Sequence, residues 1–256
     1  MSWSRQIHLK GPAELQVMRE AGRINANVLA AVNDLLKPGV STADLNAAAE
    51  DVLRKHGCVS PFKGYGHPPF PASITVSINQ ELVHGIPSKM RRLKTGDIVS
   101  VDCGTVLDGF VADSAFTAGV GEISPTAQTL LKVTEGALHA GIDKMRVGNR
   151  TGDISAAIQK YVEDRGFYVT REYTGHGVGR QMHEGPQVPN YGKAGSGMPL
   201  KNGMTIAIEP MVLAGTAETR VLPDQWTVVS ADGSLTAHFE HSIAVTEGEP
   251  LILTVP

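Results

Sequence analysis

The sequence predicts an α/β (α+β) fold built from two similar halves, each with two helices followed by strands. Along the 256 residues, hydrophobic spacing typical of helices and then of strands gives the order helix, helix, strands, and this order occurs twice. Short matching segments also recur in the same order in both halves, as in a duplicated unit. The 28 glycines and 15 prolines are many for a helical bundle and indicate turns between strands.

Two helices are expected first. Apolar residues at helical spacing predict a helix over 12–36, and the Lys-Pro-Gly segment that follows ends it. Ser41 and Asp44 resemble the two ends of a capping box, so a second helix is expected to begin there. This helix should run to His56, because Gly57 is typical of the residue just past a helix end.

Strands are expected in the segment 72–118. Runs rich in β-branched residues, bounded by turn residues, predict strands over Ile74–Ile78, 98–102 and 110–117. In the strand expected over 98–102, the period of two places Ser100 on the same face as Asp102.

The second half is expected to repeat this plan. Helix signals return at Ser124 and persist to about Met145, and another helix is expected from Thr151 to Gly166. The remaining segment, 167–254, is expected to form strands and loops.

The repeat is carried by positions that match in the same order in the two halves. They predict one catalytic domain over 1–256, with halves at about 10–120 and 121–256. The matches are Gly39 with Gly148, Thr42 with Thr151, Asp44 with Asp153, His84 with His183, Asp102 with Glu209, and Asp113 with Glu240.

Several of these matched positions carry residues that a hydrolytic metal site needs. Each half supplies a histidine, a carboxylate expected at the end of a strand, and a second carboxylate. His176 is added by a glycine-rich segment that we expect to be a bent loop. Four carboxylates and one imidazole suit two divalent ions such as Mn, Fe or Co, with Zn possible. These ligands are Asp102, Asp113, His176, Glu209 and Glu240.

The alternative for each of these residues alone is simple. An acid at a strand end often just reaches water, and a lone histidine in a glycine-rich loop is often a turn residue. The occurrence of all five together favours the metal site. Cys103, next to Asp102, is expected to point to the opposite face of its strand, into the core.

Composition excludes other classes of protein. The net charge of −3 argues against a general nucleic-acid binder, and no apolar run is long enough to span a membrane. Two cysteines, Cys58 and Cys103, do not make a disulfide framework. Because the N-terminal segment also lacks an apolar signal core, we expect the protein to be cytoplasmic.

Five separated motifs resemble those of the type I methionine aminopeptidases of bacteria, in peptidase family M24. The resemblance extends from about Lys10 to Val255 and implies the pita-bread fold, two similar halves around a central antiparallel sheet. The motifs are Val83-His-Gly-Ile-Pro, the pair Asp102 and Asp113, Gly175-His-Gly-Val-Gly-Arg-Gln-Met-His-Glu, Ile208-Glu-Pro-Met, and Phe239-Glu-His-Ser-Ile-Ala-Val-Thr.

The resemblance also implies an activity and a role for each residue. Such an enzyme removes the N-terminal methionine when the second residue is small and uncharged. Two divalent cations (Co, Mn, Fe or Zn), bridged by Asp113 and Glu240, would activate a bridging water, and Glu209 would shuttle its proton. His84 and His183 would contact the substrate amide. The methionine pocket would be lined by Tyr65, Phe70, Thr75, Met182 and Trp226.

This chain departs from the family pattern in its pocket. The stretch 65–75 is longer than the commonest version, and Thr75 stands where many relatives have cysteine. The expected partners are nascent polypeptides with an N-terminal methionine and the ribosome exit region, with no nucleic acid or membrane, and the protein is expected to be a monomer. The chain itself begins with a permitted pair, Met1-Ser2.

Two other interpretations were weighed. An X-Pro aminopeptidase or prolidase resembles this site, but such enzymes carry a further N-terminal domain, and here the first helix is expected close to Met1. A binding module that had lost its metals would lack ligands, whereas all five are present.

Overall fold

The computed structural model describes residues 7–256, so the Met1-Ser2 pair lies outside the described residues. The elements occur in the order α1 (Pro12–Asn33), α2 (Thr42–Lys55), β1 (Ile74–Ile78), β2 (Glu81–Val83), β3 (Ile98–Leu107), β4 (Phe110–Gly119), α3 (Pro125–Ile142), α4 (Thr151–Glu163), β5 (Tyr168–Val169), β6 (Thr174–Gly177), β7 (Glu184–Pro189), β8 (Thr205–Ile208), β9 (Met211–Leu213), β10 (Thr219–Val221), β11 (Val228–Ser230), β12 (Thr236–His238), β13 (His241–Ala244) and β14 (Leu251–Ile252).

The helices form where the hydrophobic spacing predicts them, but each ends one to three residues earlier than expected. After α1 the chain tightens, because the amides of Leu35 and Leu36 donate to carbonyls three residues back instead of four. The capping box at α2 is confirmed. The Asp44 amide donates to Ser41 Oγ at 3.2 Å, and the Ser41 amide donates to the Asp44 carboxylate at 3.0 Å.

Within residues 7–256 the strands form four antiparallel sheets, and two of these sheets have a corresponding strand order in the two halves. In the first half, β3 lies between β1 and β4; in the second, β8 lies between β6 and β13, and β7 and β14 extend the sheet. Strand β1 covers the predicted residues, whereas β3 continues well past the expected end at Asp102. The turn at Asp108-Gly109 explains the difference. Both residues have positive φ, which suits a two-residue hairpin turn, so β3 and β4 pair over their full length.

The two sheets meet where β4 approaches the start of β13. The amide of Glu240 donates to the carbonyl of Ala115 at 2.9 Å. Ser242 Oγ accepts from the Asp113 amide at 2.9 Å and donates to the Asp113 carbonyl at 2.8 Å. This seam joins the halves through the backbone of two of the candidate metal ligands.

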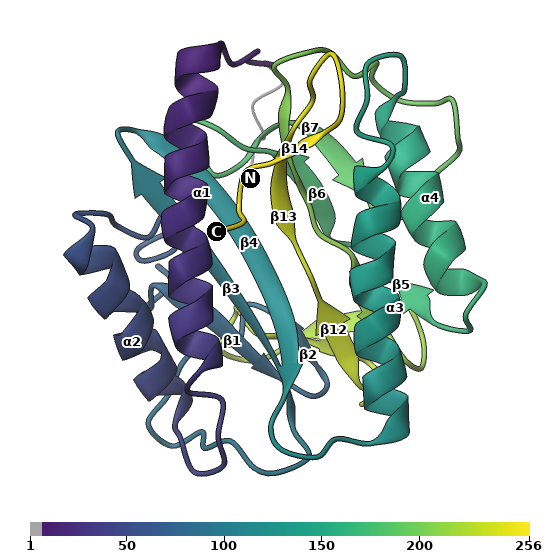
Figure 1. The fold of residues 1–256 in the computed structure, drawn as a ribbon. Helices are drawn as coiled ribbons and strands as arrows, with labels where there is room; N and C mark the ends of the chain where they lie inside the picture. The colour runs from purple at the N-terminus through teal and green to yellow at the C-terminus, as the bar shows by residue number, and fades with distance from the viewer. Residues whose placement is uncertain (1–6) are drawn as a thin grey trace.

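Helices α1, α2, α3 and α4 cover one face of the strands (Figure 1). Helix α1 packs on β3 and β4, and α3 packs on β8, β9 and β12 of the second half. Cys103 is fully buried and belongs to the core beneath α1 and α2, as predicted from the alternation along β3. Asp102 therefore points to the face of the sheet away from the helices.

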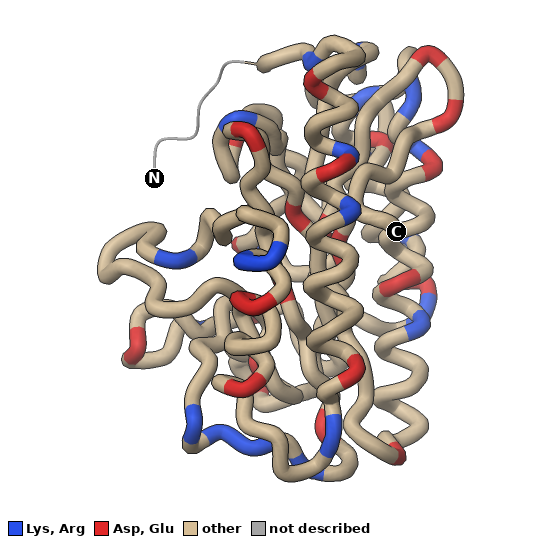
Figure 2. Tube along the Cα trace, turned by 60° about the vertical axis from the view of Figure 1, so that its left-hand side comes forward, with Lys and Arg blue, Asp and Glu red and all other residues tan. Residues whose placement is uncertain are grey.

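Charged residues of both signs are interspersed over most of the side drawn in Figure 2. None of the helices within residues 7–256 combines the length and apolar character that a membrane span requires. Cys58 and Cys103 are both free thiols and both buried.

Candidate metal centre and substrate cavity

A cavity of about 620 Å³ opens on the face of the sheets away from the helices. None of its described lining residues belongs to α1, α2, α3 or α4. All twelve residues that the sequence singled out line this one cavity: Tyr65, Phe70, Thr75, His84, Asp102, Asp113, His176, Met182, His183, Glu209, Trp226 and Glu240.

Strand pairing brings the two aspartates of the first half together. Asp102 faces Ala115 in the register of β3 with β4, and Asp113 faces Gly104, so the two carboxylates are diagonal neighbours on one face. The prediction that Asp102 ends its strand is wrong, because β3 continues to Leu107. Its place inside the paired strand holds the carboxylate more firmly than a strand end would.

The carboxylates of the second half lie at strand ends. Glu209 directly follows β8, as predicted, and Glu240 lies between β12 and β13. The backbone carbonyl of Glu209 accepts from Asn190 Nδ2 at 3.0 Å, and the backbone of Glu240 pairs with Ala115. Both side chains reach the cavity of the first-half aspartates across the seam.

His176 lies in strand β6 and not in a bent loop, which corrects the expectation from its glycine neighbours. Glycines on either side let β7 and β8 approach closely; a side chain at Gly177 would overlap the Gly185 carbonyl. His176 Nδ1 lies 2.9 Å from the Gly177 carbonyl, which can only accept, so this nitrogen carries the proton. Nε2 then presents its lone pair toward the carboxylates, as a metal-binding imidazole does.

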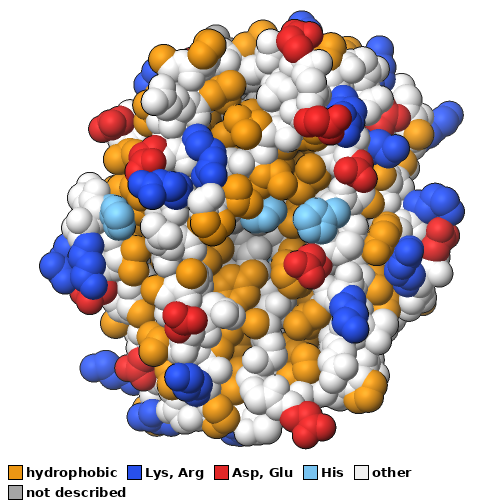
Figure 3. Space-filling view, in the orientation of Figure 1, with side chains coloured by type: hydrophobic (Ala, Val, Ile, Leu, Met, Phe, Trp, Pro, Cys, Tyr) orange, Lys and Arg blue, Asp and Glu red, His pale blue; other side chains and the backbone are white. Residues whose placement is uncertain are grey.

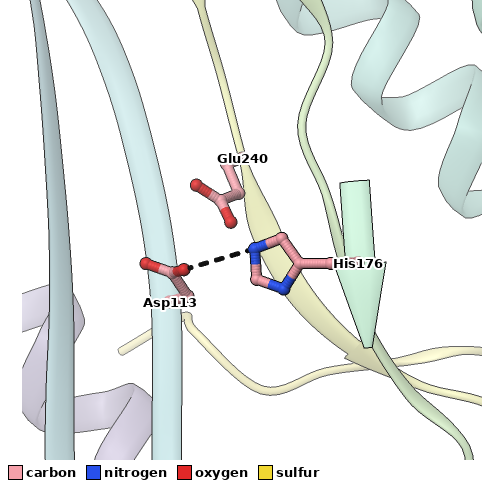
Figure 4. Close-up of side chains that lie close together, drawn as sticks. All are labelled: Asp113, His176 and Glu240. Atoms are coloured by element: carbon pink, nitrogen blue, oxygen red, sulfur yellow. Dashed lines mark ion pairs between the residues drawn. The ribbon is translucent and has the colours of Figure 1, made fainter. Parts of the chain in front are cut away.

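Three of the five candidate ligands form a compact group. One ligand atom each from Asp113, His176 and Glu240 lies within 4.8 Å of the others, and all three residues are buried. Figure 4 shows these side chains converging from β4, β6 and the segment before β13. His176 Nε2 is 3.8 Å from Asp113 Oδ2 and 3.4 Å from Glu209 Oε1.

The donor set fits a bound cation. Asp102 Oδ1, Asp113 Oδ1 and Glu240 Oε1 are buried, and within the described part of the chain none has a hydrogen-bond partner. Burial raises the pKa of Asp102 to about 7. Burial and the neighbouring negative charges raise the pKa of each of the other three carboxyls well above its ordinary value. Clustered carboxylates of this kind need a compensating positive charge, which divalent cations provide.

His84 and His183 lie at the edge of this cluster, outside the group of three. His84 follows β2 with a φ of 60°, and His183 precedes β7, so both lie in loops as predicted. Burial lowers the pKa of each imidazole to about 4, so both are neutral at pH 7. His183 Nδ1 is 2.8 Å from the hydroxyl of Tyr65.

Aromatic side chains form the apolar part of the cavity. Phe70 is buried and meets Trp226 edge to face, with ring centroids 5.2 Å apart. Trp226 Nε1 donates to the Pro68 carbonyl at 3.0 Å, which ties this ring to the longer 65–75 stretch. Thr75 faces Asp102 in the pairing of β1 with β3. The pocket therefore adjoins the carboxylates directly.

Comparison with known proteins agrees with this site. A model of metallopeptidase family M24 matches residues 16–247. The chain belongs to metallopeptidase family M24. Over 248 residues it is 51% identical to methionine aminopeptidase 1 of Bacillus subtilis. The aligned region covers 97% of this chain and 99% of the relative.

The solved structures place this M24 chain among pita-bread folds. The methionine aminopeptidase of Thermotoga maritima matches with a TM-score of 0.96 and 43% identity, over 98% of this chain and 100% of that one. The fold class and the family resemblance predicted from the motifs are thus confirmed. A prolidase of Pyrococcus furiosus matches with a TM-score of 0.77, over 97% of this chain and 65% of that one. Its sequence identity is 19%, so this likeness shows a shared fold and nothing more.

Sequence reasoning missed one buried histidine in this M24 site. His238 Nε2 is 3.7 Å from Glu240 Oε2 and, among residues 7–256, has no hydrogen-bond partner. Burial lowers its pKa to about 3. Its position two residues before Glu240 could have indicated it, because residues two apart in an extended chain share a face. Tyr173 and Gln187 also line the cavity without having been predicted.

A smaller cavity of about 320 Å³ opens on the opposite, helical face of this M24 chain. It lies between α1 and α3, where Figure 3 shows a hollow bordered by hydrophobic side chains and histidines. His139 and His241 line it, and Glu240 lines both cavities. The seam between the halves is therefore thin at Glu240.

Proposed function

We propose that this M24 chain removes the N-terminal methionine from polypeptides whose second residue is small and uncharged. One observation carries the proposal. An apolar pocket, formed by Phe70, Trp226 and Met182, adjoins a buried carboxylate–histidine cluster in the same cavity. An unbranched apolar side chain fits such a pocket while its backbone amide lies at the cluster. The relatives named methionine aminopeptidase align with this chain over almost its whole length.

Two divalent cations, of Mn, Fe, Co or Zn, are proposed to bind between the halves. Asp102, Asp113, His176, Glu209 and Glu240 would hold them. Asp113 and Glu240 would contribute to holding both cations, because each belongs to the compact group of three and each stands at the seam. When bound, the cations supply Lewis acidity, which lowers the pKa of water toward neutral and polarises a carbonyl.

The chain's own residues bind the substrate and move the proton. Glu209 lies 3.4 Å from His176 at the cavity wall and takes the proton released by the attacking water, then returns it to the leaving amine. The Tyr65 hydroxyl lies 2.8 Å from Nδ1 of neutral His183; in the proposed arrangement it donates to this nitrogen, and the ring proton is on Nε2. From there His183 donates to the scissile amide as charge develops, and His84 assists at the amide nitrogen.

The chain acts as one catalytic domain and as a monomer in the cytoplasm, on nascent polypeptides near the ribosome exit. Its pocket closes around the first side chain, so that a large second residue does not fit behind it.

Activity after metal depletion and add-back tests the function. We expect the chelated protein to be inactive, and divalent metal to restore release of methionine from a Met-Ala-Ser peptide. A Met-Lys-Ser peptide should be cleaved far less, and equal cleavage of the two would contradict the size rule. Preference for an X-Pro peptide would favour the prolidase interpretation, and inactivity with every metal would favour a binding module.

A further inference from the structure

A buried ion pair joins the N-terminal segment to the loop that carries His183. Lys10 Nζ lies 2.7 Å from Glu184 Oε2, and the two side chains are only 3% and 2% exposed. Of the ion pairs between described residues, it is the one in which both partners are buried and neither is a histidine. Because burying two charges opposes folding unless other contacts compensate, such a pair calls for a reason beyond stability.

The carboxylate of Glu184 organises the loop from within. Its second oxygen, Oε1, accepts the amide of Gln181 at 3.1 Å, so both oxygens are used. The Gly179 amide donates to the Gln181 carbonyl at 3.1 Å, and the Gly179 carbonyl accepts from Val111 at 2.7 Å. The loop 179–184 is thus folded back on itself and attached to β4.

Lys10 holds this loop from outside. Its backbone amide donates to the Gly203 carbonyl at 2.7 Å, and Gly11, the next residue, is the N-cap of α1. A side chain at Gly179 would overlap Lys10 Cε and Nζ, so the loop closes around the lysine stem. The Lys10 ammonium group is therefore positioned both by the backbone contact with Gly203 and by the packing of the lysine stem against Gly179.

Met182 and His183 lie inside the loop that this pair holds, and both line the substrate cavity. We propose that Lys10 and Glu184 are positioning residues that set the His183 imidazole against the substrate amide. This inference rests on the proposed function. Without the ammonium group, the Glu184 carboxylate would be buried and unpaired, and the loop would shift to hydrate it. A displacement of about 1 Å at a group that orients substrate can lower the rate roughly 100-fold.

A double-mutant cycle separates positioning from mere stabilisation. Lys10→Met is made in the wild type and in a His183→Ala background, and kcat/KM is measured on Met-Ala-Ser with saturating Mn²⁺. If Lys10 acts through His183, Lys10→Met lowers kcat/KM by about 10- to 100-fold in the wild type. In the His183→Ala background the same change should have almost no further effect. Metal content after dialysis should equal that of the wild type, and Lys10→Arg should recover part of the activity.

Glu14→Gln is the matched control. Glu14 forms an exposed ion pair with Arg180 at 3.1 Å, which joins the same two segments. Gln keeps the capping bond to Gly11, so activity should stay within about twofold of wild type. If Lys10→Met does not fold, the neutral pair Lys10→Met with Glu184→Gln takes its place, because it leaves no buried charge. Calorimetric binding of free methionine in the four proteins replaces turnover if His183→Ala is too slow to measure.

Equal losses in both backgrounds, or loss of metal with Lys10→Met, would overturn the positioning role. These outcomes differ from failure of the proposed function, in which the metal-loaded wild type itself would release no methionine.

Discussion

The two halves of the molecule deliver their carboxylates to the centre in different ways. Asp102 and Asp113 lie inside one long hairpin, where ten consecutive residue pairs set their position. Glu209 and Glu240 stand beyond strand ends. The Glu209 carbonyl accepts from Asn190, and the Glu240 backbone exchanges two hydrogen bonds with Ala115 of the first half. Strand pairing therefore positions the first-half carboxylates, whereas loop contacts and the seam position those of the second half.

Removing one of the proposed metal-binding acids should have the largest effect. Asp113→Asn or Glu209→Gln should lower kcat by more than about 100-fold, because each removes a charge from the proposed cation site. The protein should stay folded, with near-native circular dichroism. Near-normal turnover of either variant would contradict the assignment.

The Asp113→Asn variant should differ from the wild type in thermal stability, and the sign of the difference should depend on whether cations are bound. Burial and the charges of Asp102 and Glu209 raise the folded-state pKa of Asp113. The stability that this carboxyl contributes through its raised pKa is therefore fully present only below its unfolded-state pKa of about 3.9, where it is protonated in both states. That contribution declines as the pH rises. At pH 7.5 the chelated Asp113→Asn protein should therefore melt at a Tm equal to or above that of the chelated wild type, and the order should reverse with saturating metal.

Much of this centre could be predicted from the sequence, because strand alternation and the matched segments of the repeat are patterns of neighbouring residues. The capping box at Ser41 and strand β1 follow from near neighbours in the same way. His176 was misplaced because glycines carry no strand signal; pairing with β7 and β8 makes that segment a strand. The Lys10–Glu184 pair spans 174 positions of sequence, and no periodicity relates its partners.

The histidines should divide into a binding group and a catalytic group. His176→Ala should weaken metal binding at least about tenfold, since its Nε2 faces the carboxylates at the proposed cation site. His84→Ala should keep the metals and lower kcat, because the ring lies beside Trp226 at the cavity edge. Metal content after dialysis gives the comparison. If His84→Ala lost the metals and His176→Ala kept them, the two roles would be reversed.

A smaller effect is expected at the seam itself. Ser242→Ala removes the hydroxyl that bonds both the amide and the carbonyl of Asp113 in the core, which should lower the free energy of unfolding by about 1–3 kcal/mol. Ser100→Ala is the matched control inside the first half. Among the described residues its hydroxyl has one hydrogen-bond partner, Thr117 Oγ1 at 2.8 Å, so the loss should be about 0.5–1.5 kcal/mol. Urea denaturation measures both, and equal losses would argue against a special dependence on the seam.

The most direct test of a centre shared by the halves is anomalous diffraction from crystals of the protein loaded with Mn²⁺. We expect two ions in the large cavity, with Asp113 and Glu240 contacting both and His176 Nε2 binding one. Each ligand atom should lie roughly 2.0–2.3 Å from its metal. Metal held by the residues of one half alone, or bound outside this cavity, would contradict the account.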